Sequence, residues 1–192
     1  MKKLLSLFLT VAMACSLAVT ASAAEEPAAA ASDPDLTGSI VILHTNDVHG
    51  GIAGYAQVAA QKQYYQKCGA YVLPFDAGDF IQGDPTVSAS QGETAVELMN
   101  LAGYDAAALG NHEFDHGQAF LGRMIDSMDF EVVCANVVSD TCTFPQLPPY
   151  TIVDRDGIRI GFVGVVTNYE GPGHPAGNES SFAGLEFPDP QA

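Results

Sequence analysis

The sequence has few basic residues and few cysteines. Of its 192 residues, seven are Lys or Arg and 23 are Asp or Glu, which gives a formal net charge of −16. A surface this acidic repels nucleic-acid polymers and anionic membranes, so we expect neither as a partner. A small anionic substrate remains compatible, because a bound metal ion can reverse the sign of the charge locally. The four cysteines form no Cys-x-x-Cys pair, which argues against a cysteine zinc site.

Long apolar runs are also lacking, apart from one near the N-terminus. Two lysines precede an apolar run over 4–19, and the small residues Ala21-Ser22-Ala23 follow it. This order is typical of a bacterial-type secretory signal peptide over residues 1–23. We therefore expect a secreted chain, periplasmic or extracellular, without stable membrane insertion. An uncleaved anchor is an alternative, although the run is short for a span of roughly 20 residues, and a lipoprotein processed before Cys15 is another.

The rest of the chain separates into a short leader and one longer region. Residues 24–35 are rich in Ala, Pro and acids and have no apolar period, so we predict a flexible leader. Residues 36–192 have the length of one domain or part of one. Loss of the signal peptide would leave Cys68, Cys134 and Cys142, and a Cys134–Cys142 disulfide or buried free thiols are both compatible with that number. The oligomeric state cannot be predicted from the sequence.

Strand-like and helix-like segments alternate along this region. Apolar spacing and turn residues predict strands over 39–44, 71–75, 105–109 and 131–138, helices over 54–67, 91–102 and 118–128, and a hairpin from 150–153 and 158–166. Residues 168–192 are rich in Gly and Pro, and we expect little regular structure there. The alternation predicts an α/β fold with a mainly parallel sheet.

Polar residues that can hold metals follow three of the predicted strands. Asp47 and His49 follow the first strand, Asp79 the second, and Asn111 and His112 the third. Because sites in open α/β sheets form at the carboxyl ends of strands, these side chains should converge. Each residue alone also has a structural explanation, as a turn or capping residue, so the prediction depends on their combination.

The residue types suit a pair of divalent ions. Asp47 and His49 are two residues apart, so in an extended backbone both side chains would point the same way. Asp79 follows a glycine that permits a tight turn, and its carboxylate could bridge two ions. Imidazole and carboxylate ligands together favour zinc, manganese, iron or cobalt over calcium. Two such ions can clamp a phosphoryl group and activate water.

Three motifs resemble the metallophosphoesterase (calcineurin-like) superfamily in its 5′-nucleotidase branch. They are HTNDVHG over 44–50, DAGD over 76–79 followed by Gln82-Gly83, and LGNHEFD over 109–115. The resemblance covers 40 to about 166. It implies that Asp47 and His49 hold one metal, that Asn111 holds the other and that Asp79 bridges both. It also implies that His112 is the catalytic histidine beside the phosphate, oriented by Asp115.

The resemblance also implies a fold and a substrate class. The family fold is an αββα sandwich, of which residues 36–192 would form the N-terminal, incomplete part, and the substrate would be a small-molecule nucleotide. The family's Gly-His-x-His motif and its C-terminal nucleotide-binding domain are absent from these 192 residues, so we expect this chain to be inactive alone. Alternatives within the family are a UDP-sugar hydrolase and a 2′,3′-cyclic nucleotide phosphodiesterase. An alternative of another class is a non-catalytic, secreted acidic module with weak metal binding.

Overall fold

The structure, a computed structural model, describes residues 32–139, 144–168 and 173–190. The chain divides into two units, Met1–Pro34 and Asp35–Ala192, and the description below concerns the second. The predicted signal peptide and most of the leader lie outside the described residues. Cys142 does too, so the alternative of a Cys134–Cys142 disulfide stays a prediction.

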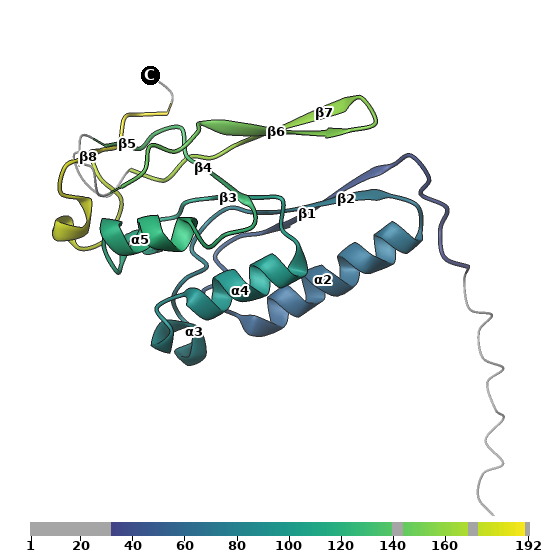
Figure 1. Cartoon of the computed structure of the whole chain (residues 1–192), viewed down its shortest axis with the longest axis horizontal. Coiled ribbons are helices and arrows are strands. Elements are labelled where there is room, and N and C mark those ends of the chain that lie inside the picture. Colours follow the sequence, from purple (N-terminus) through teal and green to yellow (C-terminus); the bar gives the residue numbers. More distant parts are fainter. Residues whose placement is uncertain (1–31, 140–143, 169–172, 191–192) are drawn as a thin grey trace, which may run out of the picture. The chain divides into compact units, whose positions relative to one another are not determined.

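A four-stranded parallel sheet lies at the centre of the second unit. Its strands are β1 (Ile40–Thr45), β2 (Tyr71–Asp76), β3 (Ala106–Ala108) and β4 (Glu131–Val133), and their order is β1-β2-β3-β4. All three pairings are parallel. Strands that follow one another in the sequence are therefore neighbours in the sheet, and their carboxyl ends lie next to each other. The predicted α/β fold with a parallel sheet is confirmed (Figure 1).

Helices α2 (Ile52–Lys67) and α4 (Glu93–Ala102) pack against each other on one face of the sheet (Figure 1). Tyr55 from α2 and Met99 from α4 are buried in the same core cluster as Ala107 of β3. Gly103 ends α4 in the left-handed conformation, as predicted, and Gly92 at its N-terminus also has a positive φ. Between α2 and β4 the chain also forms α3 (Pro85–Ala89), the 3₁₀ turn η1 (His112–Phe114) and α5 (Gln118–Ile125).

The other face of the sheet is covered by a β-hairpin. Strands β6 (Tyr150–Arg155) and β7 (Ile158–Val163) pair antiparallel around the predicted Asp-Gly turn. Leu73, Phe75 and Ala106 of the sheet pack against the inner face of the hairpin. The rings of Phe75 and Phe162 stack with centroids 4.6 Å apart, an arrangement that adds about 0.5–1.5 kcal/mol beyond the buried area. The structure thus contains a helix layer, the parallel sheet and the hairpin, in this order. This is the order of the first three layers of the predicted αββα sandwich.

One expectation for the second half of the chain is wrong. The strand predicted over 131–138 ends at Val133, because the buried Asn136 side chain bonds both the N–H and the C=O of Val166 and turns the chain away. A separate strand β5 (Val138–Ser139) then pairs antiparallel with β8 (Leu185–Glu186). The described part of the tail holds little regular structure, as expected, and contributes the two-residue β8 and the 3₁₀ turn η2 (Glu179–Phe182).

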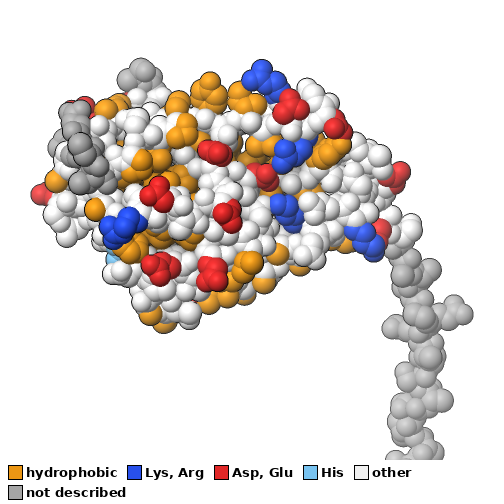
Figure 2. Space-filling model, in the orientation of Figure 1, with side chains coloured by type: hydrophobic (Ala, Val, Ile, Leu, Met, Phe, Trp, Pro, Cys, Tyr) orange, Lys and Arg blue, Asp and Glu red, His pale blue; other side chains and the backbone are white. Residues whose placement is uncertain are grey.

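The surface mixes charge with scattered apolar side chains. On the face that Figure 2 shows, acidic and basic side chains are interspersed, and apolar ones lie along the upper edge, where Figure 1 draws the hairpin. The exposed apolar residues of the hairpin are Tyr150, Ile152, Ile158 and Val163. Within the described parts of the chain, no helix is both long enough and apolar enough to cross a membrane.

Candidate functional site

Three loops meet at the carboxyl end of the sheet, and backbone hydrogen bonds hold them together. The loop after β1 donates from the Asp47 nitrogen to the Gly78 oxygen at 3.2 Å and from the His49 nitrogen to the Asp79 oxygen at 2.9 Å. The loop after β3 donates from the His112 nitrogen to Asp79 Oδ1 at 2.8 Å. Asp79, from the loop after β2, is therefore the residue on which the other two loops converge.

The convergence brings together side chains that could bind a metal ion. His49, Asp79 and His112 each offer one ligand atom, and these three atoms lie within 4.8 Å of one another. Asp47 is adjacent, with its Oδ1 3.7 Å from His49 Nε2. Asn111 stands directly before His112, at the start of η1. The structure thus gathers at one edge of the sheet all the residues that the sequence placed after these strands.

His112 and Asp115 form a hydrogen-bonded pair. His112 Nδ1 lies 2.9 Å from Asp115 Oδ2, and each side chain is about one third exposed, at 34% and 35%. With Nδ1 engaged, His112 can offer only Nε2 to a ligand or substrate. The His112 ring meets the His49 ring edge-on, at 5.3 Å between centroids.

Asp47, His49 and Asp79 share an unusual backbone conformation. Their φ angles are 52°, 46° and 63°, in the left-handed region that non-glycine residues rarely adopt. The expectation that Asp47 and His49 face the same way from extended backbone is therefore wrong. They lie in a turn after β1, and their shared direction comes from the hydrogen bonds of that turn to Gly78 and Asp79. Strain of this kind is often concentrated at functional sites.

Close contact between the loops after β2 and β3 requires glycine on both sides. Gly78 has φ +104°, and an added Cβ there would overlap the backbone of Gly110. A Cβ on Gly110 would in turn overlap the carboxylate and the backbone nitrogen of Asp79. The predicted tight turn at Gly78 is confirmed, and this contact sets the distance between Asp79 and His112.

Glu113, for which no role was predicted, is fully buried next to the site. Its carboxylate accepts three backbone N–H groups: those of Asp79 at 2.8 Å and Gly110 at 2.6 Å on Oε2, and that of Phe80 at 2.9 Å on Oε1. Burial raises the pKa of Glu113 to about 7, and the three hydrogen bonds oppose that rise. The only hint in the sequence was that Glu113 lies inside the third motif. Its partners are backbone N–H groups, and sequence spacing does not identify such partners.

A second buried carboxylate joins the ends of β1 and β2. Asp76 accepts hydrogen bonds from the Thr45 hydroxyl at 2.5 Å and from the Gly78 nitrogen at 2.8 Å, and the Tyr104 hydroxyl lies 2.9 Å from Thr45 Oγ1. Burial raises the pKa of Asp76 to about 6. The network fixes the point at which the chain leaves β2 for Gly78 and Asp79.

The electrostatics of the site suit a bound cation. Burial raises the pKa of Asp79, and the neighbouring Asp47 carboxylate raises it further, while the His112 N–H and the His112 charge oppose the rise. Two carboxylates this close repel each other unless a positive charge lies between them. The donor set of imidazole nitrogen and carboxylate oxygen fits zinc, manganese, iron or cobalt.

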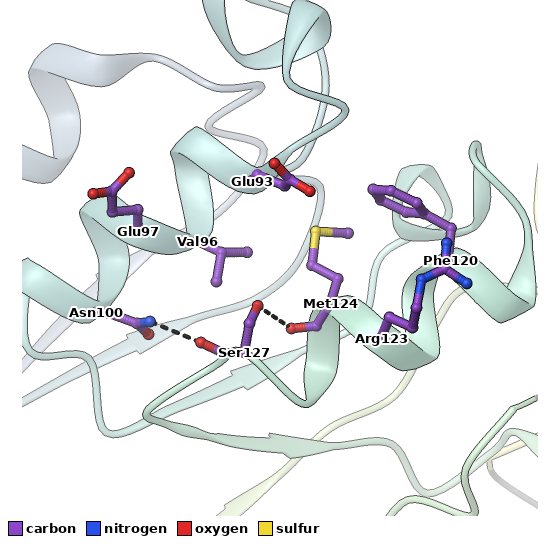
Figure 3. Close-up of a pocket in the computed structure, with 8 residues that line it drawn as sticks. All are labelled: Glu93, Val96, Glu97, Asn100, Phe120, Arg123, Met124 and Ser127. Atoms are coloured by element: carbon purple, nitrogen blue, oxygen red, sulfur yellow. Dashed lines mark hydrogen bonds between the residues drawn. The ribbon is translucent and has the colours of Figure 1, made fainter.

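A separate groove of about 410 Å³ lies away from these loops, between α4 and α5 (Figure 3). Glu93 and Glu97 line its α4 side and Phe120, Arg123 and Met124 its α5 side. The guanidinium of Arg123 lies over the Phe120 ring and donates to the Ala119 oxygen. Both glutamates are exposed to solvent, so this groove does not offer the converging donors found at the strand ends.

The chain is similar to known proteins in both sequence and fold. Residues 40–173 match the model of the calcineurin-like phosphoesterase family. Protein UshA of Yersinia enterocolitica is 33% identical over an alignment that covers 83% of this chain and 30% of the relative. The rat 5′-nucleotidase is 32% identical over 65% of this chain and 26% of the relative. The chain thus spans about a third of the length of the curated relatives it matches.

Solved structures resemble the same region. The NAD nucleotidase of Haemophilus influenzae superimposes with a TM-score of 0.65 at 25% identity, over 78% of this chain and 29% of that one. The 5′-nucleotidase precursor of Thermus thermophilus gives a TM-score of 0.59 at 28% identity, over 78% of this chain and 32% of that one. Each superposition thus covers more than three quarters of this chain.

Proposed function

Because the chain belongs to the calcineurin-like phosphoesterase family, we propose that it forms the metal-binding part of a two-metal phosphohydrolase of 5′-nucleotidase type. The observation that carries the proposal is the convergence of His49, Asp79 and His112 within 4.8 Å at the ends of three parallel strands. The names of the relatives, 5′-nucleotidase among them, support a nucleotide as the substrate class.

Each side chain has a separate task in this proposal. Asp47 and His49 would hold one ion and Asn111 the other, and Asp79 would be shared between them. Asp79 Oδ1 keeps a lone pair for this role beyond the one that accepts the His112 N–H. Two divalent ions, when bound, would neutralise charge on the phosphoryl oxygens and lower the pKa of a water molecule.

His112 and Asp115 supply the proton chemistry. Asp115 accepts a hydrogen bond from Nδ1 and stabilises positive charge on the ring, so Nε2–H of His112 faces the phosphoryl group. From there it donates a hydrogen bond to a phosphoryl oxygen in the transition state or protonates the departing oxygen. This proton chemistry needs only His112 and Asp115, which both lie in the loop after β3.

The activity of the 192-residue chain alone is a separate part of the proposal. Four ligand side chains cannot complete the coordination of two ions, because even one zinc ion takes four ligands in most sites. We therefore propose weak metal binding and slow turnover by this chain alone, since misplacement by about 1 Å can cost roughly a hundredfold in rate. Secretion through residues 1–23 is also proposed and is independent of the site.

Calorimetric titration with Mn²⁺ tests the site directly. We expect binding by the unmodified chain and by Asp129→Asn, which changes an exposed carboxylate, and at least a tenfold weaker association for Asp79→Asn. Binding of two ions that is unaffected by Asp79→Asn would refute the site. Product formation then ranks the substrates, with His112→Ala as the inactive reference: adenosine and phosphate from AMP, UMP and glucose 1-phosphate from UDP-glucose, and ring-opened AMP from 2′,3′-cyclic AMP. Metal binding without product from any of them would favour a non-catalytic module.

A further inference from the structure

The loop after β2 surrounds His49 on three sides. The His49 nitrogen donates to the Asp79 oxygen, and the His49 oxygen accepts the Asp84 N–H at 2.8 Å. Gly83, at φ +113°, lies so close that an added Cβ would come within 2.6 Å of the His49 Cβ. A further contact is to the ring, where Gln82 Nε2 lies 2.7 Å from His49 Nδ1. The backbone and the ring of His49 are thus fixed by residues of a single segment, 79–84.

The Gln82 contact determines which nitrogen of His49 faces the candidate metal ligands. Nδ1 is engaged by the amide, whereas Nε2 lies 3.7 Å from Asp47 Oδ1. A neutral imidazole carries its proton on one nitrogen only, and the hydrogen bond at Nδ1 therefore decides whether Nε2 has a free lone pair. Histidine ligands in proteins almost always donate their other N–H to an acceptor that fixes this choice.

Glutamine can serve both tautomers of His49. With its NH₂ group toward Nδ1, as in this structure, Gln82 donates, and the proton of a neutral ring is on Nε2, facing the Asp47 carboxylate. After a half turn of the amide, the Gln82 oxygen accepts from Nδ1–H and leaves the Nε2 lone pair free. A half turn of a terminal amide exchanges two groups of almost equal size, so it needs no rearrangement of the loop.

We propose that Gln82 is the positioning residue of His49, and that its amide turns from donor to acceptor when a divalent cation binds Nε2. The inference rests on the metal site proposed above, but it concerns a residue outside that ligand set. It assigns to the loop after β2 two separate tasks, since Asp79 binds the cation while Gln82 selects the nitrogen that meets it.

Imidazole ¹⁵N spectra of the full chain at pH 8, without metal and with Zn²⁺, test this directly. In the unmodified chain we expect the proton on His49 Nε2 without metal and on Nδ1 with zinc. In Gln82→Glu, whose carboxylate only accepts, the proton should be on Nδ1 in both conditions. A zinc-loaded His49 that binds through Nδ1, or a metal-free tautomer that is the same in Gln82→Glu and the unmodified chain, would overturn the proposal.

Zinc affinity gives a second, independent readout. Gln82→Met keeps the length of the side chain but cannot hydrogen-bond Nδ1, and we expect zinc to bind about 10- to 100-fold more weakly. The matched control is Gln61→Met, an exposed position on α2, which should bind as the unmodified chain does. Equal affinities for both variants would refute the role of Gln82. If no variant binds zinc, the proposed metal site fails, and the metal-free spectra of Gln82→Glu still decide whether Gln82 sets the tautomer.

Discussion

A hydrogen bond of 2.8 Å joins the Glu113 Oε2 atom to the backbone nitrogen of Asp79. It connects a side chain from the loop after β3 to the candidate bridging ligand in the loop after β2. The same carboxylate also accepts from Phe80 and from Gly110, so one buried side chain holds both loops. The position of Asp79 relative to His112 therefore depends on a residue that touches neither a metal nor a substrate.

We expect Glu113→Ala to destabilise the fold strongly. It leaves three backbone N–H groups at the site without their acceptor, and each buried unsatisfied donor costs about 1–3 kcal/mol. The free energy of unfolding in urea should fall by about 3 kcal/mol or more, whereas Glu97→Ala, at an exposed position on α4, should change it by less than about 0.5 kcal/mol. Equal stabilities of the two variants would show that water replaces the carboxylate.

The sequence predicted the sheet, the hairpin and the meeting of the three loops, because these follow from apolar periodicity and from strand direction. It did not predict how the loops are held. His49, in the left-handed conformation, is held by a backbone hydrogen bond to Asp79. The Glu113 carboxylate accepts backbone N–H groups of the loop after β2. In both cases the partners are about 30 residues apart in the chain. Gln82 and Glu113 lie within recognised motifs, but a motif does not show which residues their side chains will contact. Asn136 ended a predicted strand for the same reason, since its partner Val166 lies 30 residues away.

Backbone strain at Asp47 can be separated from the loss of its carboxylate. Asp47→Gly and Asp47→Ala both remove a proposed metal ligand, and we expect both to weaken Mn²⁺ binding equally. Only glycine relieves the left-handed φ of 52°, which costs an ordinary residue about 1–2 kcal/mol. In urea unfolding, Asp47→Gly should be more stable than Asp47→Ala by about 1 kcal/mol. The same pair at Asp129, which lacks a positive φ, should show no such advantage for glycine.

Substitution of Gly78 should damage the site as well as the fold. In Gly78→Ala the new methyl group would overlap the Gly110 backbone and push the loops after β2 and β3 apart. Gly38→Ala is the matched control, because Gly38 also has a positive φ, +78°, but no atom within 4 Å of an added Cβ. We expect both variants to lose stability, Gly78→Ala by more, and only Gly78→Ala to lose Mn²⁺ affinity in calorimetry. A similar loss of affinity in Gly38→Ala would mean that general destabilisation explains the effect.

Asp105 should make stability depend on pH. Its Oδ1 lies 3.2 Å from Nη2 of Arg155 on the hairpin, while its Oδ2 is buried without a hydrogen-bond partner in the described part of the chain. Burial raises the pKa of Asp105 above its ordinary value of 3.8, although Lys62 and Arg155 oppose the rise. A raised pKa in the folded state means that the folded chain holds this proton more tightly than the unfolded chain does. The contribution of Asp105 to the free energy of unfolding is then fully present below pH 3.8, the ordinary pKa of the group. It is lost as the pH rises through the pKa of Asp105 in the folded state.

Asp105→Asn removes this titration and therefore isolates it. As pH rises from about 4 to about 8, we expect the stability of Asp105→Asn to increase relative to that of the unmodified chain, because only the latter must bury a charge at high pH. Urea unfolding at several pH values measures this difference in stability. For Asp129→Asn, which changes an exposed carboxylate, the difference in stability from the unmodified chain should be nearly independent of pH. A difference that instead moves in favour of the unmodified chain as pH rises would show that the Arg155 ion pair outweighs the cost of burial, and that Asp105 and Arg155 hold the hairpin to the sheet through their charges.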